Sequence, residues 1–538
     1  MPATGVDEAP DELGQLANRR ELQADLDENL RHLRSLFGED RSPDLVIREF
    51  PVLGQTRGAA VYLSTLVDPR LVGSQVLRPI LASNSAMAPS IQVPLAPSDV
   101  RTQLEGLFIA NGRVSTLNEL AGFLTALSHG QTGILIEGEP RALMVQVSGY
   151  DKRAVGPPET EVVIHGPHEG FVEAFDSNLS LIRRRVATPL LRLEKVKVGH
   201  TSETEVGLLY IQGLANPALV AEARRRLEDS GLDAALDTQY IEELIEDQSF
   251  TIFPQLYSTE RPDVAAANLL EGRIALLVNG SPFVLIAPAT MNMFLQSADD
   301  YYNRWTFGSI VRPLRWLMML ITIYFTAIYV AVVSFSQSML PTGLLISFAA
   351  AREKVPFTVL TEALIMEAVF EVLREAGIRL PRQIGQTISI VGVLVIGQAA
   401  VQASIISAPM VILVAFSGIA SFVVPQYAFG LALRILRFPM ILAGGIFGLF
   451  GIVTLTVLTA IHLLALRSFG VPYLAGLSPV TTTSPQDTLV RLPHWLMRRR
   501  PRQLDQATTW RNAPAQMPRG GRNHGGGPEL NEKERPQP

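Results

Sequence analysis

The sequence contains no cysteine among its 538 residues. Disulfide bonds, thiolate metal sites and cysteine nucleophiles are therefore excluded. It also lacks the glycine-rich phosphate loop Gly-x4-Gly-Lys, the His-Glu-x-x-His zinc motif and the Gly-x-Ser-x-Gly nucleophile motif. We therefore expect a protein that is not an enzyme and that uses neither a metal nor a cofactor.

Charged residues are scarce in one long part of the chain. Most of them lie before Arg315 or after Leu466, and the formal net charge of the chain is only −5. So small a net charge gives no indication of nucleic-acid binding. The long uncharged stretches between Arg315 and Leu466 are instead typical of a membrane domain.

The first half of the chain has the pattern of a water-soluble protein. Residues 1–40 are acidic, predict an amphipathic helix and contain no apolar core of a secretory signal, so this half is expected in the cytoplasm. Strands and helices then alternate up to residue 300, which predicts an α/β fold, and one of the expected helices covers residues 115–128. No internal repeat is apparent in the sequence.

An Asn-Gly pair marks the end of the soluble half. Asn279 and Gly280 separate two short apolar runs, at 274–278 and 282–286. A transmembrane helix needs about 20 continuous apolar residues, whereas Asn-Gly between β-rich runs is the strongest short-range signal for a hairpin. The segment is therefore predicted to be a β-hairpin and not a membrane span.

The membrane domain is predicted to occupy residues 301–470. Lipid offers no hydrogen-bond partners, so its apolar runs must be helices. The predicted spans are 316–339, 384–403, 407–424 and 440–466. Arginines flank the first and last spans, which places both ends of the domain in the cytoplasm and requires an even number of spans. Arg434 and Arg437 fall in a loop that this topology puts outside, so a five-span alternative stays open.

One segment between the first two spans is both apolar and acidic. Residues 357–376 have a helical pattern and carry Glu362, Glu367 and Glu371. One interpretation is an amphipathic helix at the membrane interface with its acids in water. The other is a helix that lines an aqueous path, because charges at membrane depth usually mark a route for ions or substrates. The three glutamates are therefore candidate pore-lining residues.

Small and amide side chains in the apolar spans predict helix packing. Glycines at short spacings let helices approach closely, and glutamines in lipid form hydrogen bonds between helices. The candidate packing residues are Gly444, Gly448, Gly451, Gln398 and Gln402.

A set of motifs resembles one known family, the A subunits of GerA-type spore germinant receptors. The resemblance covers roughly residues 44–467, and its motifs stand in the order of the family. They include HGPHEGF at 165–171, NLSLIRRR at 178–185, YIQGLANP at 210–217, FPQ at 253–255 and VIGQAAV at 395–401. His165 and His168 depart from the family pattern, which usually has arginines there.

The resemblance implies an architecture and a location. The soluble half would be a two-part α/β module, here at 41–160 and 161–300, followed by the multi-pass helical domain. Residues 471–538 lie beyond the resemblance; the arginines after the last span predict a cytoplasmic tail, and its Pro, Gly, Arg and Asn content predicts disorder after residue 501. The protein would lie in the inner membrane of bacterial endospores, in contact with membrane lipid.

The resemblance also implies partners and a role. Such subunits work with a permease-like B subunit and a lipoprotein C subunit, and are viewed as homo-oligomeric cation channels opened by germinant. The acidic segment then becomes the natural candidate for the pore. A transporter of small solutes and a non-conducting receptor scaffold remain as alternatives.

Overall fold

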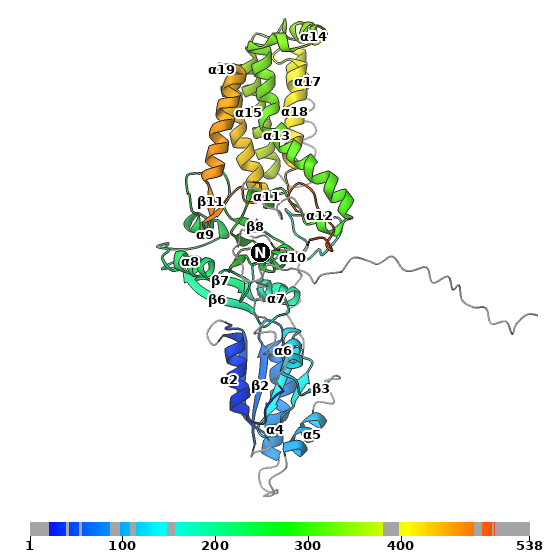
Figure 1. Ribbon diagram of the computed structural model, residues 1–538, viewed down its shortest axis with the longest axis vertical. Coiled ribbons are helices and arrows are strands. Elements are labelled where there is room, and N and C mark those ends of the chain that lie inside the picture. Colours follow the sequence, from blue (N-terminus) through cyan, green and yellow to red (C-terminus); the bar gives the residue numbers. More distant parts are fainter. Residues whose placement is uncertain are drawn as a thin grey trace, which may run out of the picture.

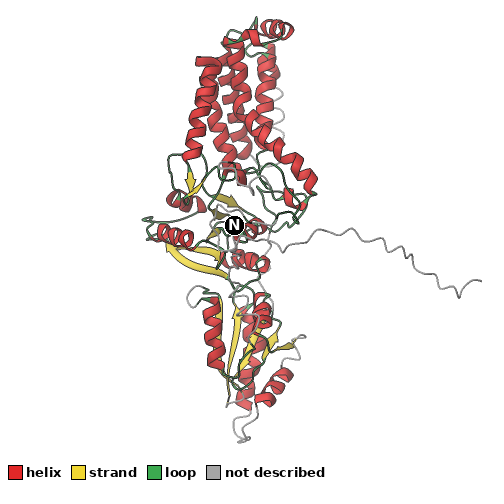
Figure 2. Cartoon of the chain, viewed as in Figure 1, coloured by secondary structure: helices red, strands yellow, loops and turns green. Residues whose placement is uncertain are grey.

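The computed structural model describes residues 21–38, 42–52, 56–86, 97–107, 114–147, 156–379, 397–477, 487–497 and 500. Two soluble subdomains and a bundle of helices follow one another along the long axis of the molecule (Figure 1). Strands are concentrated in the two subdomains and the long helices in the bundle (Figure 2). The predicted fold class, an α/β soluble half followed by an α-helical membrane domain, is confirmed.

The first subdomain is an antiparallel sheet with helices on both faces. Its strand order is β1-β2-β4-β5-β3, and the bounds are β1 Leu45–Val52, β2 Thr56–Leu63, β3 Val114–Leu117, β4 Thr132–Ile136 and β5 Ala142–Val145. Alternate residues of a strand point to opposite faces. In β2, Val61 packs towards helices α2 (Leu26–Phe37) and α6 (Leu120–Ser128), whereas Tyr62 packs towards the helical segments at 69–86 and 97–107.

That second face is covered by a continuous helical stretch and one further helix. The elements are α3 Pro69–Leu71, the π-helical turn Val72–Leu77, α4 Arg78–Ala86 and α5 Pro97–Leu107. Helix α2 belongs to the same core as the sheet. The predicted N-terminal helix, as far as it lies in the described residues, is therefore part of the first subdomain; residues 1–20 lie outside them.

The second subdomain has a sheet of the same kind. Its order is β6-β7-β9-β10-β8, with β6 Leu191–Val198, β7 Thr204–Ile211, β8 Tyr257–Thr259, β9 Ile274–Val278 and β10 Val284–Ala287. Helices α7 (Phe175–Arg185) and α10 (Pro262–Leu269) cover one face, and α8 (Pro217–Glu228) and α9 (Thr238–Ile245) cover the other. Strands β9 and β10 pair antiparallel around Asn279 and Gly280, so the predicted hairpin is confirmed.

The two subdomains repeat one topology, although no repeat was evident in the sequence. In each, a helix precedes two paired strands, helices follow, and a third strand, a helix and a hairpin complete the sheet. The third strand takes the edge position in both sheets. Topology is set by strand order and by which faces are apolar, so it can repeat where residue identities do not.

The helix predicted over 115–128 is wrong in its first part. Residues 114–117 form strand β3, which pairs with β5 at the edge of the first sheet, and α6 starts only at Leu120. The sheet edge offered hydrogen-bond partners to this short β-branched segment, and tertiary pairing overrode the local helical pattern.

In the described part of the chain, five helices and a short helical piece form the bundle and its loops. They are α13 Trp305–Phe335, α14 Thr342–Arg352, α15 Val359–Arg379, α17 Gly397–Gln402, α18 Ala408–Phe422 and α19 Tyr427–Ala465. Among the described residues, α13 and α19 are long and apolar enough to cross a membrane. The acidic helix α15 packs against α13, α18 and α19 (Figure 1). Most of the predicted span 384–403 lies outside the described residues.

Helix α19 folds back on itself at Gly448. Phe429 and His462 would be about 50 Å apart in one straight helix, yet their rings lie 6.3 and 6.2 Å from the ring of Phe253. Gly448 has φ 64° and ψ −149°, a conformation open almost only to glycine. The single predicted span at 440–466 is therefore wrong, because the chain forms two antiparallel arms, 427–447 and 449–465.

The chain returns to the soluble half after the second arm. The short strands β11 (Arg467–Ser468) and β12 (Val471–Pro472) pair, and the Met291 amide donates to the Tyr473 carbonyl at 2.8 Å. The Ser468 hydroxyl donates to the Gln255 carbonyl at 2.6 Å. The soluble half and the segment after the bundle thus lie at the same end of the bundle.

Candidate functional site

The acidic residues of α15 meet arginines of α19 inside the bundle. Helix α15 runs beside the arm 427–447, and Glu367 and Glu371, one turn apart, face Arg437 and Arg434 respectively. Cations and anions placed at matching intervals along two antiparallel helices can pair in successive turns. These two pairs form an acid–arginine ladder between α15 and α19.

Glu367 and Arg437 form the inner pair. Their side chains are 0% and 1% exposed, and an Arg437 Nη1 donates to Glu367 Oε2. The Thr326 hydroxyl of α13 donates to the other carboxylate oxygen at 3.2 Å. Arg437 Nε and Nη2 have no hydrogen-bond partner among the described residues. A pair so far from solvent depends on its own partners for neutralisation, since burying an uncompensated charge is costly.

Glu371 and Arg434 form the outer pair. Their closest N–O distance is 3.0 Å, and Glu371 is 29% exposed whereas Arg434 is 8% exposed. The Arg434 guanidinium also lies 5.9 Å from the ring centroid of Tyr427. Of the three candidate acids, Glu371 is the most accessible in the single chain.

Glu362 lies about two and a half turns of α15 before Glu371 and uses different partners. The backbone amide of Ser407 donates to Glu362 Oε1 at 2.6 Å, and the Ser407 hydroxyl donates to the same oxygen. Arg352 Nε lies 3.5 Å from its other oxygen. Because Ser407 stands just before α18, the carboxylate meets an unsatisfied amide of a helix N-terminus, where negative charge is favoured.

The structure corrects the position of two arginines. Arg434 and Arg437 lie within the helical arm 427–447 and are buried, and not in an outside loop as the predicted topology had them. A search of the sequence for apolar runs ends each predicted span at the nearest charged residue. It cannot detect that each of these arginines is paired with a glutamate of another helix. Glu362 and Glu367 likewise have no exposed surface in the single chain.

The candidate packing residues have different surroundings. A Cβ on Gly444 would lie 2.8 Å from the Ala327 carbonyl of α13, so the two backbones touch there. Gly448 makes the turn of α19, and a Cβ on Gly451 would clash with the Ala443 carbonyl across that turn. Gln398 and Gln402 lie on α17 with exposed side chains.

A second charged network at the base of α13 was missed from the sequence. Asp300 accepts from Arg312 at 3.1 Å and from Arg315 at 2.7 Å, and Arg312 also donates to Asp487 at 2.7 Å. The sequence suggested basic flanks of a span. No local spacing signals these pairs, since Asp487 is distant from Arg312 in the chain.

Comparison with known proteins identifies the family. The family model described as the Bacillus/Clostridium GerA spore germination protein matches residues 31–503. The chain belongs to this family. Spore germination protein KA of Bacillus subtilis is 41% identical over 89% of this chain and 86% of its own length. Spore germination protein GerLA of Bacillus cereus is 39% identical over 90% of this chain and 96% of its own length.

A solved structure is also related. The N-terminal domain of the A subunit of the Bacillus megaterium spore germinant receptor GerK3 is 35% identical and matches with a TM-score of 0.39, over 51% of this chain and 98% of that domain. The family model and the two relatives confirm the resemblance found from the sequence motifs: this is a GerA-family spore germination protein, related to spore germination A subunits.

Proposed function

We propose that the chain is the membrane A subunit of a nutrient germinant receptor, and that copies of it form a cation path opened by germinant. The observation that carries the proposal is the acid–arginine ladder of α15 and α19, set inside the membrane domain of a germination-family protein. Acids at membrane depth are costly and are retained mainly where ions or substrates pass. No chemical step is required of the protein.

In this proposal the ladder is the closed state of the path. Arg437 and Arg434 neutralise Glu367 and Glu371 while the receptor is at rest. Nutrient binding to the complex would favour a second arrangement of α15 against α19, in which the carboxylates of Glu362, Glu367 and Glu371 face the axis and meet cations instead. A ligand can shift such an equilibrium only by its different affinity for the two states.

We further propose an even number of membrane crossings with both termini in the spore core. Helices α13, α15, α18 and the two arms of α19 would cross, together with the predicted span at 384–403. Six crossings return the chain to its starting side, in agreement with the contact between Tyr473 and Met291. The spore inner membrane is the expected location, and a permease-like B subunit and a lipoprotein C subunit are the expected partners.

The exposed apolar faces of the bundle support a membrane and an oligomer. On the second arm of α19, Phe450, Val453, Val457 and Ile461 are all more than half exposed in the single chain. Side chains of this kind are stable against lipid or against a second copy of the chain, and not against water.

The test is potassium release from spores. A strain that lacks its own copy of this chain is complemented with the wild type, Glu367→Gln or Glu371→Gln, and potassium and sodium release are followed after a nutrient mixture is added. Altered amplitude or altered cation selectivity is expected for both variants. Glu375→Gln is the matched control, because Glu375 is on the same helix but is 62% exposed and pairs with Arg379 on the surface.

Two outcomes would point to the alternatives. Unchanged release and selectivity in both variants would refute the pore assignment and favour a scaffold that conducts nothing. Saturable uptake of a small solute by the reconstituted chain, without germinant-dependent cation release, would favour a transporter.

A further inference from the structure

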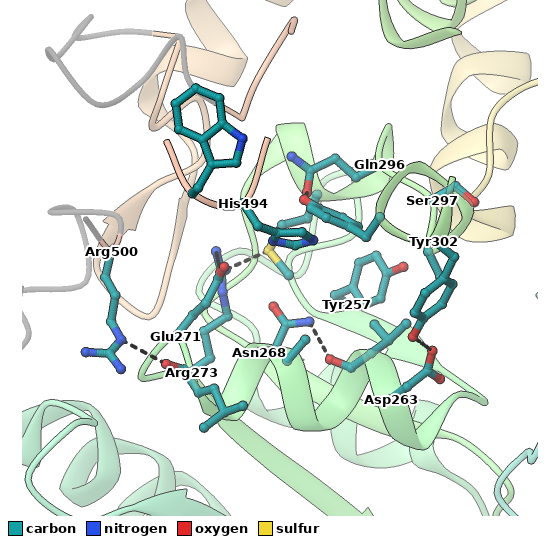
Figure 3. A pocket seen from close by; sticks show the side chains of 17 residues that line it. Tyr257, Asp263, Asn268, Glu271, Arg273, Gln296, Ser297, Tyr302, His494 and Arg500 are labelled. Atoms are coloured by element: carbon teal, nitrogen blue, oxygen red, sulfur yellow. Dashed lines mark hydrogen bonds and ion pairs between the residues drawn. The ribbon is translucent and has the colours of Figure 1, made fainter. Parts of the chain in front are cut away.

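A cavity of about 850 Å³ lies outside the bundle, beside the second soluble subdomain. Its walls come from α10, from the connector at 293–302 that leads into α13, and from the C-terminal segment around His494 and Trp495. Figure 3 shows Arg273 and Glu271 on one side of this cavity and Asp263 and Tyr302 on the other. The volume falls within the range of small-molecule sites.

Aromatic rings supply much of the apolar wall. Tyr257, Tyr301, Tyr302 and Trp495 all line the cavity. The hydroxyl of Tyr301 donates to Asp487 at 2.8 Å, and that of Tyr302 donates to Asp263. Because these hydroxyl groups are already engaged, the rings offer flat apolar surface to a ligand and few further polar contacts.

The acids of the cavity already have partners. Asp263 accepts from Arg261 Nη2 at 2.8 Å and from the Tyr302 hydroxyl. Glu271 faces Arg273, although their closest N–O distance is 3.9 Å. Among the lining residues, two guanidinium groups (Arg273 and Arg500) stand beside these two carboxylates. The formal charges of the walls therefore balance, and the preference for an anion depends on how well Arg273 itself is neutralised.

Arg273 is a buried cation of the cavity wall whose ion pair with Glu271 is long, at 3.9 Å. It is 5% exposed, and a guanidinium stays ionised in proteins even when buried. Its Nη1 donates to an uncharged acceptor, the Pro288 carbonyl, and its Nε has no hydrogen-bond partner among the described residues. Burial lowers the pKa of Arg273, which is the direction expected of a cation held without a close counter-charge.

We propose that this cavity binds a small organic anion, with one carboxylate on an aromatic or apolar body. The carboxylate would face Arg273, where a charge-assisted hydrogen bond replaces the distant contact with Glu271. The body would lie between the tyrosine rings and Trp495. Because the walls belong to the sheet domain, the connector into α13 and the C-terminal segment, an occupied cavity would hold these three parts together.

This proposal does not depend on the proposed ion path, and a binding measurement tests it. The full chain is purified in detergent, and calorimetry compares indole-3-acetate with two probes of the same ring system, the neutral indole-3-acetamide and the cationic tryptamine. Benzoate and benzamide form a second matched pair. The carboxylates are expected to bind at least about tenfold more tightly than the amides, which corresponds to about 1.4 kcal/mol.

Variants locate the site. Arg273→Gln is expected to lose the carboxylate preference and Arg273→Lys to retain part of it. Trp495→Ala leaves the sheet core untouched and is expected to weaken the binding of every ring probe at least threefold. This variant tests the site even if Arg273→Gln does not fold. Arg379→Gln, a surface variant on α15, is the control.

Three results would overturn the proposal. Equal or weaker binding of the carboxylates relative to the amides would remove the anion preference. Stronger binding of tryptamine would assign the cavity to a cation. Carboxylate binding that both Arg273→Lys and Trp495→Ala leave unchanged would place the ligand elsewhere on the chain.

Discussion

The pair between Glu367 and Arg437 gives the sharpest prediction about the bundle. Glu367→Leu leaves Arg437 buried without its counter-charge, and removal of one partner of a buried pair typically costs about 3–5 kcal/mol. The side chains are 0% and 1% exposed, so no solvent screening reduces this cost. The lost hydrogen bond from Thr326 adds about 1 kcal/mol.

The double variant separates charge burial from packing. Glu367→Leu with Arg437→Met removes both charges and keeps apolar volume, and such replacements are often neutral or even stabilising. We therefore expect the double variant to recover most of the stability that Glu367→Leu loses. For a unit the size of the membrane domain, the single variant should lower the melting temperature by about 10 °C.

The assay is thermal unfolding of the full chain in detergent, followed by tryptophan fluorescence. Glu375→Gln is the control, because its partner Arg379 is 78% exposed and a surface pair contributes less than about 1 kcal/mol. The reasoning fails if Glu367→Leu costs no more than the control, or if the double variant is as unstable as Glu367→Leu. A double variant that folds but releases no potassium would assign the acid to conduction.

Three further predictions concern other parts of the chain. Burial, with nearby Glu246 and Glu243, raises the pKa of Glu242 to about 8. The stability that its protonated form contributes should therefore be lost as the pH rises from about 4.5 to 8. Glu242→Gln should raise the melting temperature at pH 8.5 and leave it unchanged at pH 4.5. Gly448→Ala should cost about 1–3 kcal/mol in thermal unfolding because its φ of 64° suits glycine, whereas Gly343→Ala, in open space, should be neutral. Asp44→Asn should destabilise the subdomain junction by about 3 kcal/mol, measured as faster proteolysis, because it breaks a buried pair with Arg183 at 2.6 Å; equal proteolysis rates would contradict this.

The soluble half was largely predictable because its signals are local. Alternating apolar residues located most strands, and Asn279 with Gly280 located the hairpin. The edge strand at 114–117 was mistaken for helix because its stability comes from pairing with β5, which lies downstream in the sequence. The repeated topology was not predictable, since it resides in strand order and not in residue identity.

The membrane half was less predictable, because its turn and its ion pairs depend on contacts between residues that are distant in the sequence. Hydropathy located the apolar segments but not the reversal at Gly448, because a glycine that packs against a neighbouring helix and one that turns the chain look alike in sequence. The four-residue spacing of the acids on α15 was visible, and their partners were not. Arg434 and Arg437 fall between the apolar runs 407–424 and 440–466, so the sequence predicts a loop there, and nothing local shows that acids on another helix pair with them.

Cation flux through the assembled receptor tests the proposed function most directly. Proteoliposomes that hold the chain with its B and C partners would be loaded with a potassium-sensitive dye, and flux measured before and after nutrient is added. We predict flux that needs both nutrient and this chain, favours cations over chloride, and changes in Glu371→Gln. Nutrient binding by the complex without any cation flux would contradict the proposal.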